Sequence, residues 1–149
     1  MENERPNVEA QYKLMLIIWA SLLMSQFMFL LVLVMTKPHL FNFDFSKPIA
    51  GASGAMVLGF AVAAVTAVLF SFAFRKRLNE RAVAAQDTGQ VQSGLIIALA
   101  LCEASSLFGL TLAFAFDYQY FFLWIGLGVL GMILHFPKRD ELHAASYKK

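Results

Sequence analysis

Residues 91–116, VQSGLIIALALCEASSLFGLTLAFAF, are apolar almost throughout, and one carboxylate, Glu103, lies near their middle. A helix of this length crosses a hydrocarbon core of about 30 Å, because each helical residue adds about 1.5 Å. Glu103 is then close to the centre of the bilayer. The stretch therefore predicts a membrane-spanning helix with one charged group in an environment that penalises charge.

Three further apolar runs, at about residues 14–35, 49–74 and 120–136, have comparable character. Of the 149 residues, 59% are hydrophobic and 15% charged, whereas soluble domains carry about 25% charged residues. A soluble chain this short could not cover so much apolar surface, because about a third of its unfolded area stays exposed after folding. We expect an all-α membrane protein, a four-transmembrane-helix bundle that forms one membrane domain over residues 1–149.

The basic residues predict the orientation of this bundle. Ten of the twelve Lys and Arg residues lie in the N-terminal segment, in the connection between the second and third runs, or in the polar tail 137–149. Cytoplasmic loops are enriched in Lys and Arg, so both termini are expected in the cytoplasm, N-in and C-in. The acidic N-terminus lacks a signal-peptide pattern, so we expect a multi-pass protein of the cell inner (plasma) membrane.

The two longer connections differ in character. Residues 36–48 alternate phenylalanines with polar residues, which is typical either of a short strand or of a loop whose aromatic rings dip into the headgroup region. The loop is the preferred interpretation. Residues 75–90 predict a helical extension followed by a turn at Asp87–Gly89.

Two polar residues at mid-membrane depth are candidate ion- or proton-binding groups. Glu103 is either protonated or faces the bundle interior and meets a donor. Gln26 is the polar midpoint of the first run, with Ser25 and Ser21 beside it, and could donate its amide to Glu103. The alternative is that these polar groups only join helices.

Small residues predict close packing between the second and third helices. Such residues allow two backbones to approach, so we expect a tight antiparallel hairpin in which the two small faces meet. The alternative is that they reflect membrane composition alone. The predicted packing residues are Gly51, Ala55, Gly59, Ala63 and Ala67 on the second helix, followed by Ser71, and Cys102, Ser106 and Gly109 on the third.

No sequence pattern indicates catalysis, a cofactor or a metal. The single cysteine, Cys102, excludes an intrachain disulfide and is expected to be packing material. His39, His135 and His143 are dispersed, with His135 expected at the membrane interface. We find no phosphate loop or nucleophile motif. The basic clusters are interpreted as topology signals, so no nucleic acid partner and no enzymatic activity are expected.

One segment resembles a known family. Residues 100–113, ALCEASSLFGLTLA, are similar to the carboxylate-bearing helix of rotor-ring proteolipids, the subunit c family of rotary ATPases, in which an Ala-rich turn and an aromatic–Gly–Leu step follow a mid-membrane acid. A small-residue helix and a polar loop precede that helix in both cases. The resemblance covers the second and third helices. It implies that Glu103 is protonated and deprotonated as a ring turns.

Three functions remain open from the sequence. The preferred one is a non-catalytic structural or accessory subunit of a larger or self-associated membrane complex, such as an energy-converting assembly. The alternatives are a proton- or ion-translocating proteolipid that uses Glu103, and a small transporter or channel lined by Gln26 and Glu103. The expected partners are the lipid bilayer and other membrane subunits or a second copy of the chain.

Overall fold

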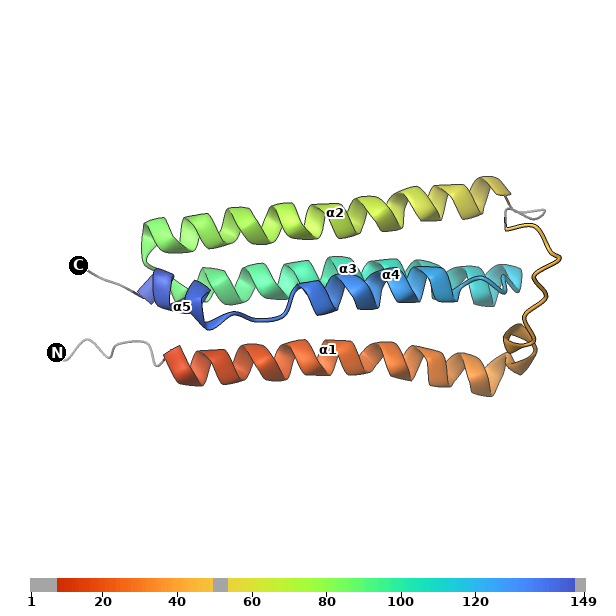
Figure 1. Cartoon of the computed structure of the whole chain (residues 1–149), viewed down its shortest axis with the longest axis horizontal. Coiled ribbons are helices and arrows are strands. Elements are labelled where there is room, and N and C mark those ends of the chain that lie inside the picture. Colours follow the sequence, from red (N-terminus) through yellow and green to blue (C-terminus); the bar gives the residue numbers. More distant parts are fainter. Residues whose placement is uncertain (1–7, 50–53, 147–149) are drawn as a thin grey trace.

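A computed structural model of the chain describes residues 8–49 and 54–146. These residues form an all-α structure without strands, as the sequence predicted. The helices run along one long axis, with α3 and α4 between α1 and α2 (Figure 1). They are α1 (Val8–Thr36), the 3-10 helix η1 (Pro38–Phe41), α2 (Gly54–Ala85), α3 (Thr88–Phe116), α4 (Phe122–Leu134) and α5 (Arg139–Ser146).

Three of these helices, α1, α2 and α3, are long and apolar enough to cross a membrane, which indicates a membrane protein. The fourth is shorter than its predicted range of 120–136. Helix α4 has 13 residues and extends about 20 Å, less than a hydrocarbon core of about 30 Å. The count of four spans therefore stays a prediction.

The start of α1 and helix α5 lie at one end of the bundle, together with the α2–α3 turn (Figure 1). We call this the terminal end. In the turn, Gln86 adopts a positive φ of 53°, and the Asp87 side chain accepts a hydrogen bond from the Gly89 backbone at 2.9 Å. An aspartate at this position caps the first turn of a helix, so α3 begins at Thr88. The predicted helical extension and turn are both present.

The tail after residue 136 is not polar throughout. Within it, α5 buries Leu142 and Ala145, three residues apart on one helix face, against the ends of the other helices. Arg139 anchors the same segment to α1, because its guanidinium lies 4.6 Å from the centre of the Tyr12 ring. The short apolar spacing in a charged context explains why the sequence pattern did not predict this helix.

At the opposite end, the first connection is a loop rather than a strand. Its phenylalanine rings contact one another, Phe41 with Phe43 edge to face and Phe43 with Phe45 stacked. The Phe41 ring also lies 5.5 Å from that of Phe121. Lys37 binds the α3–α4 turn through Asp117, with 2.6 Å between Nζ and Oδ1. Hydrogen bonds from Lys37 and from His39 hold the pKa of the exposed Asp117 carboxyl below its usual value. These contacts fix the loop over the start of α4.

The predicted antiparallel pair of α2 and α3 is present, but the predicted α2 stripe forms only part of its contact. Helix α2 does pack along α3, but its buried positions are Val57, Ala64, Val68, Ser71, Arg75 and Ala82. These are spaced by three, four or seven residues, as one face of a helix requires. A strict four-residue spacing cannot follow one face, since each step advances about 40° beyond a full turn at 3.6 residues per turn.

The small face of α3 also packs against α4, and Cys102 in this face contacts Ser71 of α2 at 3.6 Å. A Cβ added at Gly128 would lie 2.7 Å from the Cys102 carbonyl oxygen, and one added at Gly109 would lie 2.8 Å from the Phe121 carbonyl oxygen. Both distances are shorter than van der Waals contact, so only glycine fits at these two positions. Glycine at these two positions therefore allows α3 and α4 to pack closely.

Candidate functional site

A polar group joins α1 and α3 at the middle of their lengths. Ser25 Oγ lies 2.7 Å from Glu103 Oε1, and Gln26 Nε2 donates to Ser25 Oγ at 3.3 Å. Gln26 is 1% exposed, whereas Glu103 is only partly buried. The structure thus brings both predicted residues to one place, with Ser25 between them rather than in direct contact with each other.

The hydroxyl of Ser25 can serve Glu103 in two ways. It has one proton and two acceptors within 2.7 Å, the Glu103 carboxylate and the Leu22 carbonyl oxygen. With Glu103 ionised, Ser25 donates to the carboxylate. With Glu103 protonated, the carboxylic acid donates to Ser25, and Ser25 donates to Leu22. Because a hydroxyl accepts two bonds and donates one, the second arrangement fills every bonding position of Ser25.

Two acceptors of this group stay open. Within the described residues, Gln26 Oε1 is buried without a hydrogen-bond partner, and Oε1 is the one Glu103 oxygen for which a hydrogen bond is found. The other Glu103 oxygen belongs to a side chain that is open to the outside of the bundle. An ionised oxygen facing lipid is costly, so it requires a proton or a donor from outside this chain.

The remaining predicted packing residues divide by helix. Cys102, Ser106 and Gly109 are buried, and all three face α4. On α2, Ala55 and Gly59 are exposed, and a Cβ added at Gly59 would meet no atom within 4 Å among the described residues. Ala63 and Ala67 are partly buried, and Gly51 is outside the described residues. The α2 stripe thus turns from the outside of the bundle towards its interior.

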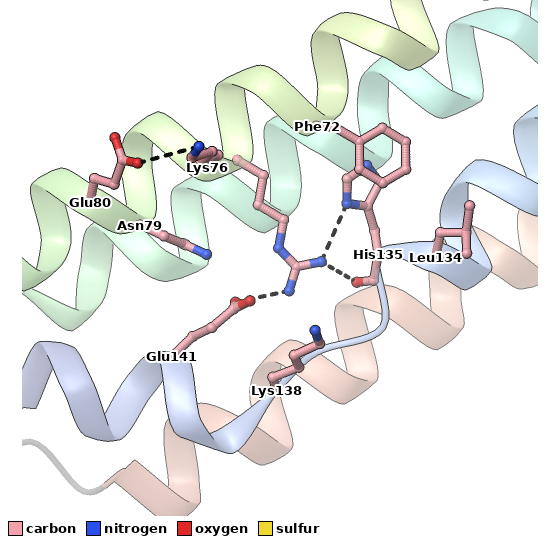
Figure 2. Close-up of a pocket in the computed structure, with 9 residues that line it drawn as sticks. Phe72, Lys76, Asn79, Glu80, Leu134, His135, Lys138 and Glu141 are labelled. Atoms are coloured by element: carbon pink, nitrogen blue, oxygen red, sulfur yellow. Dashed lines mark hydrogen bonds and ion pairs between the residues drawn. The ribbon is translucent and has the colours of Figure 1, made fainter.

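A second polar cluster lies at the terminal end and was not predicted. His135, which follows the last residue of α4, is 1% exposed. Its Nε2 is 2.7 Å from Ser71 Oγ, and its Nδ1 is 3.3 Å from Arg75 Nη1. Arg75 also donates to the His135 carbonyl oxygen at 2.7 Å and to Glu141 at 2.9 Å. The cluster connects α2, the end of α4 and α5 (Figure 2).

The guanidinium determines the protonation state of His135. Arginine can only donate, so Nδ1 must accept and the imidazole proton lies on Nε2, from which it is donated to Ser71. Ser71 in turn donates to the Val68 carbonyl oxygen at 2.6 Å. Burial and the Arg75 charge lower the pKa of His135 to about 4. His135 is therefore neutral, and because the nitrogen that faces Ser71 already carries the proton, it cannot take one from Ser71, so this pair does not have the geometry of an activated nucleophile.

A sequence signal for this cluster exists in hindsight. Ser71 and Arg75 are four residues apart and so share one face of α2, at the point where its apolar part ends. The sequence does not show that His135 joins them, because it lies 60 residues after Arg75. Arg75 was interpreted as a topology signal, so its hydrogen bonds to His135 and Glu141 were not predicted.

Within the described residues, no three His, Cys, Asp or Glu side chains are grouped so that they could hold a metal ion. No known protein family, curated protein or solved structure matches the chain. The geometry of the two polar clusters is therefore the basis for any functional conclusion.

Proposed function

We propose that the chain is a non-catalytic subunit of a larger or self-associated membrane assembly, and that it docks through the face of α3 around Glu103. Helices α1, α2, α3 and α4 all span the bilayer in this proposal, with both termini in the cytoplasm. The observation that carries it is the partly exposed carboxyl group at mid-membrane depth, whose second oxygen needs either a proton or a donor from outside the chain.

The residues around Glu103 suit a helix–helix contact. Ile96, Ala100 and Leu107 are seven, three and four residues from Glu103, so they share its side of α3. All three are exposed. We call Ile96, Ala100, Glu103 and Leu107 the Glu103 face. It presents apolar side chains around one strong hydrogen-bonding group, and polar groups of this kind join helices within membranes.

Purification in mild detergent tests this docking. Glu103→Leu removes the hydrogen-bonding group, and we expect it to abolish co-purification of a partner or of a second, differently tagged copy. Glu103→Gln keeps an acceptor and adds a donor, so it should retain the partner. Glu9→Leu, which replaces an exposed glutamate in the first turn of α1, is the control. Equal partner recovery with Glu103→Leu and wild type would refute the proposal.

A second candidate is a proton-translocating proteolipid that uses Glu103. The arrangement around Ser25 favours it, because the hydroxyl satisfies both the protonated and the ionised carboxyl. In this case a carbodiimide should modify Glu103 selectively and in a pH-dependent manner. Proton flux into liposomes should be lost in Glu103→Gln, the same variant that retains the docked partner. Absence of flux in the wild type and in the variant alike would exclude this candidate.

A further inference from the structure

A cavity of about 390 Å³ opens at the terminal end, between α2 and the segment that joins α4 to α5. We call it the basal cavity. It lies beside the Arg75–His135 cluster, at the level where the apolar part of α2 ends and charged residues begin (Figure 2). In a membrane-spanning bundle this level corresponds to the headgroup region.

The charged groups of the cavity do not cancel. Arg75 and Glu141 form an ion pair at 2.9 Å with partly buried side chains, so they neutralise each other. Lys76 has only a long contact of 3.9 Å with Glu80, and both side chains are well exposed, so this pair contributes little. Among the described residues, no partner is found for the ammonium group of Lys138. Three cations and two carboxylates line the cavity, which leaves an excess of one positive charge.

Neutral donors add to this charge. No hydrogen bond is found for the side-chain amide of Asn79 within the described part of the chain, and its nitrogen points into the cavity (Figure 2). Its Oδ1 is buried without a partner among the same residues. An oxyanion placed between Lys76, Lys138 and the Asn79 nitrogen would receive hydrogen bonds from all three, two of them charge-assisted.

The opposite wall of the cavity is apolar. Phe72 and Leu134 also line it, and both are exposed, at 39% and 59%. Phe72 and Leu134 lie nearer to the middle of the bundle than Arg75 and His135 do. They are therefore on the hydrocarbon side of the basic groups. A small anion would make no contact with this apolar wall. A phospholipid would contact both parts of the cavity, because its phosphate would lie at the basic groups and its acyl chains along the apolar wall.

We propose that the basal cavity binds the phosphate headgroup of an anionic phospholipid. The phosphate contacts Lys76, Lys138 and the Asn79 amide, and the acyl chains run along Phe72 and Leu134. Arg75 is a positioning residue here, because its hydrogen bonds to His135 and Glu141 hold the wall of the cavity in place. Basic pockets on the cytoplasmic side of helix bundles recognise lipid headgroups by this chemistry.

Native mass spectrometry of the protein in neutral detergent tests this site, with phosphatidylglycerol or phosphatidylcholine added. We compare Lys76→Gln/Lys138→Gln with Arg77→Gln/Arg81→Gln, which removes the same charge from exposed positions of α2 that do not line the cavity. The wild type and the arginine variant should retain phosphatidylglycerol in preference to phosphatidylcholine. Retention should fall at least about fivefold in the lysine variant, the contribution of one basic residue near an anionic lipid.

Three results would overturn the assignment. Equal loss in the two double variants would indicate diffuse attraction, and equal retention of both lipids would exclude headgroup recognition. Inorganic phosphate that displaces the lipid at equal concentration would assign the cavity to a free anion. Weak competition by phosphate supports the lipid, because the Phe72 and Leu134 wall then adds to binding. The single variant Lys138→Gln repeats the test if the double variant does not fold.

Discussion

Replacing Gly128 by alanine is predicted to destabilise the bundle, because α4 crosses α3 at this residue. The new Cβ would lie 2.7 Å from the Cys102 carbonyl oxygen and closer still to Ser106 Oγ. The serine side chain can rotate away, but the backbone oxygen can move only if the helices separate. Overpacking of this kind costs about 1–3 kcal/mol.

Gly126→Ala is the matched control for this substitution. Gly126 lies two residues before Gly128 on the same helix, and a Cβ added there would meet no atom within 4 Å among the described residues. Alanine favours a helix over glycine by about 0.5–1 kcal/mol at either position. The propensity gain cancels in the comparison, so the difference between the two variants, about 1–3 kcal/mol, reports the contact with α3 alone.

Reversible unfolding in mixed detergent micelles, followed by circular dichroism, measures this difference. We expect Gly126→Ala to be as stable as the wild type or slightly more stable, and Gly128→Ala to unfold at a lower denaturing-detergent fraction. Equal stability of the two variants would contradict the close approach of α3 and α4. It would also remove the reason for glycine at position 128.

Three further predictions concern the polar groups. A double-mutant cycle of Ser25→Ala and Glu103→Ala, measured by the same unfolding assay, should give a coupling of about 0.5–1.5 kcal/mol; additive effects would exclude the bond between them. Stability of the wild type relative to His135→Gln should fall as the pH drops from about 6.5 to 4, since only the unfolded chain takes up a proton in that window; a constant difference would show that His135 titrates normally. Asp117→Asn should destabilise the protein at neutral pH, and this difference should start to shrink only as the pH falls below about 4 and vanish below the lowered pKa of Asp117, because the ion pair needs the ionised carboxyl; an undiminished difference at low pH would exclude the ion pair with Lys37.

Apolar runs determined how much of the fold was predictable. Three helices emerged near their expected ranges because an uninterrupted apolar stretch of this length has few other structures in a membrane. The polar extension of α2 was predicted, but that of α1 was missed, because α1 begins at Val8, six residues before the apolar run. The capping aspartate at Asp87 was predictable from local chemistry.

The pairing of the helices was harder to predict, because small residues indicate close approach without naming the partner. Cys102, Ser106 and Gly109 are buried as packing residues, yet all three contact α4, and Cys102 also meets the predicted α2 stripe, through Ser71 at 3.6 Å. The glycines of α4 carry the decisive information, since Gly128 is complementary in shape to the Cys102–Ser106 turn.

For the candidate site, the position of the polar residues along their helices could be predicted from the sequence, but the contacts between them could not. Glu103 and Gln26 were selected because polar groups are costly at the bilayer centre. The intermediate position of Ser25, and the long-range cluster of Ser71, Arg75 and His135, depend on how helices rotate about their axes. A single sequence does not contain that rotation.

Site-specific photocrosslinking in native membranes tests the central claim, docking through the Glu103 face, most directly. A photoreactive amino acid replaces Leu107, four residues from Glu103 on the same face, or Leu130, on the outside of α4; the two are similarly exposed, at 44% and 54%. We predict one discrete adduct, with another subunit or a second copy of the chain, from position 107 and none from position 130. Labelling of lipid alone from position 107, or the same adduct from both positions, would contradict the proposed docking.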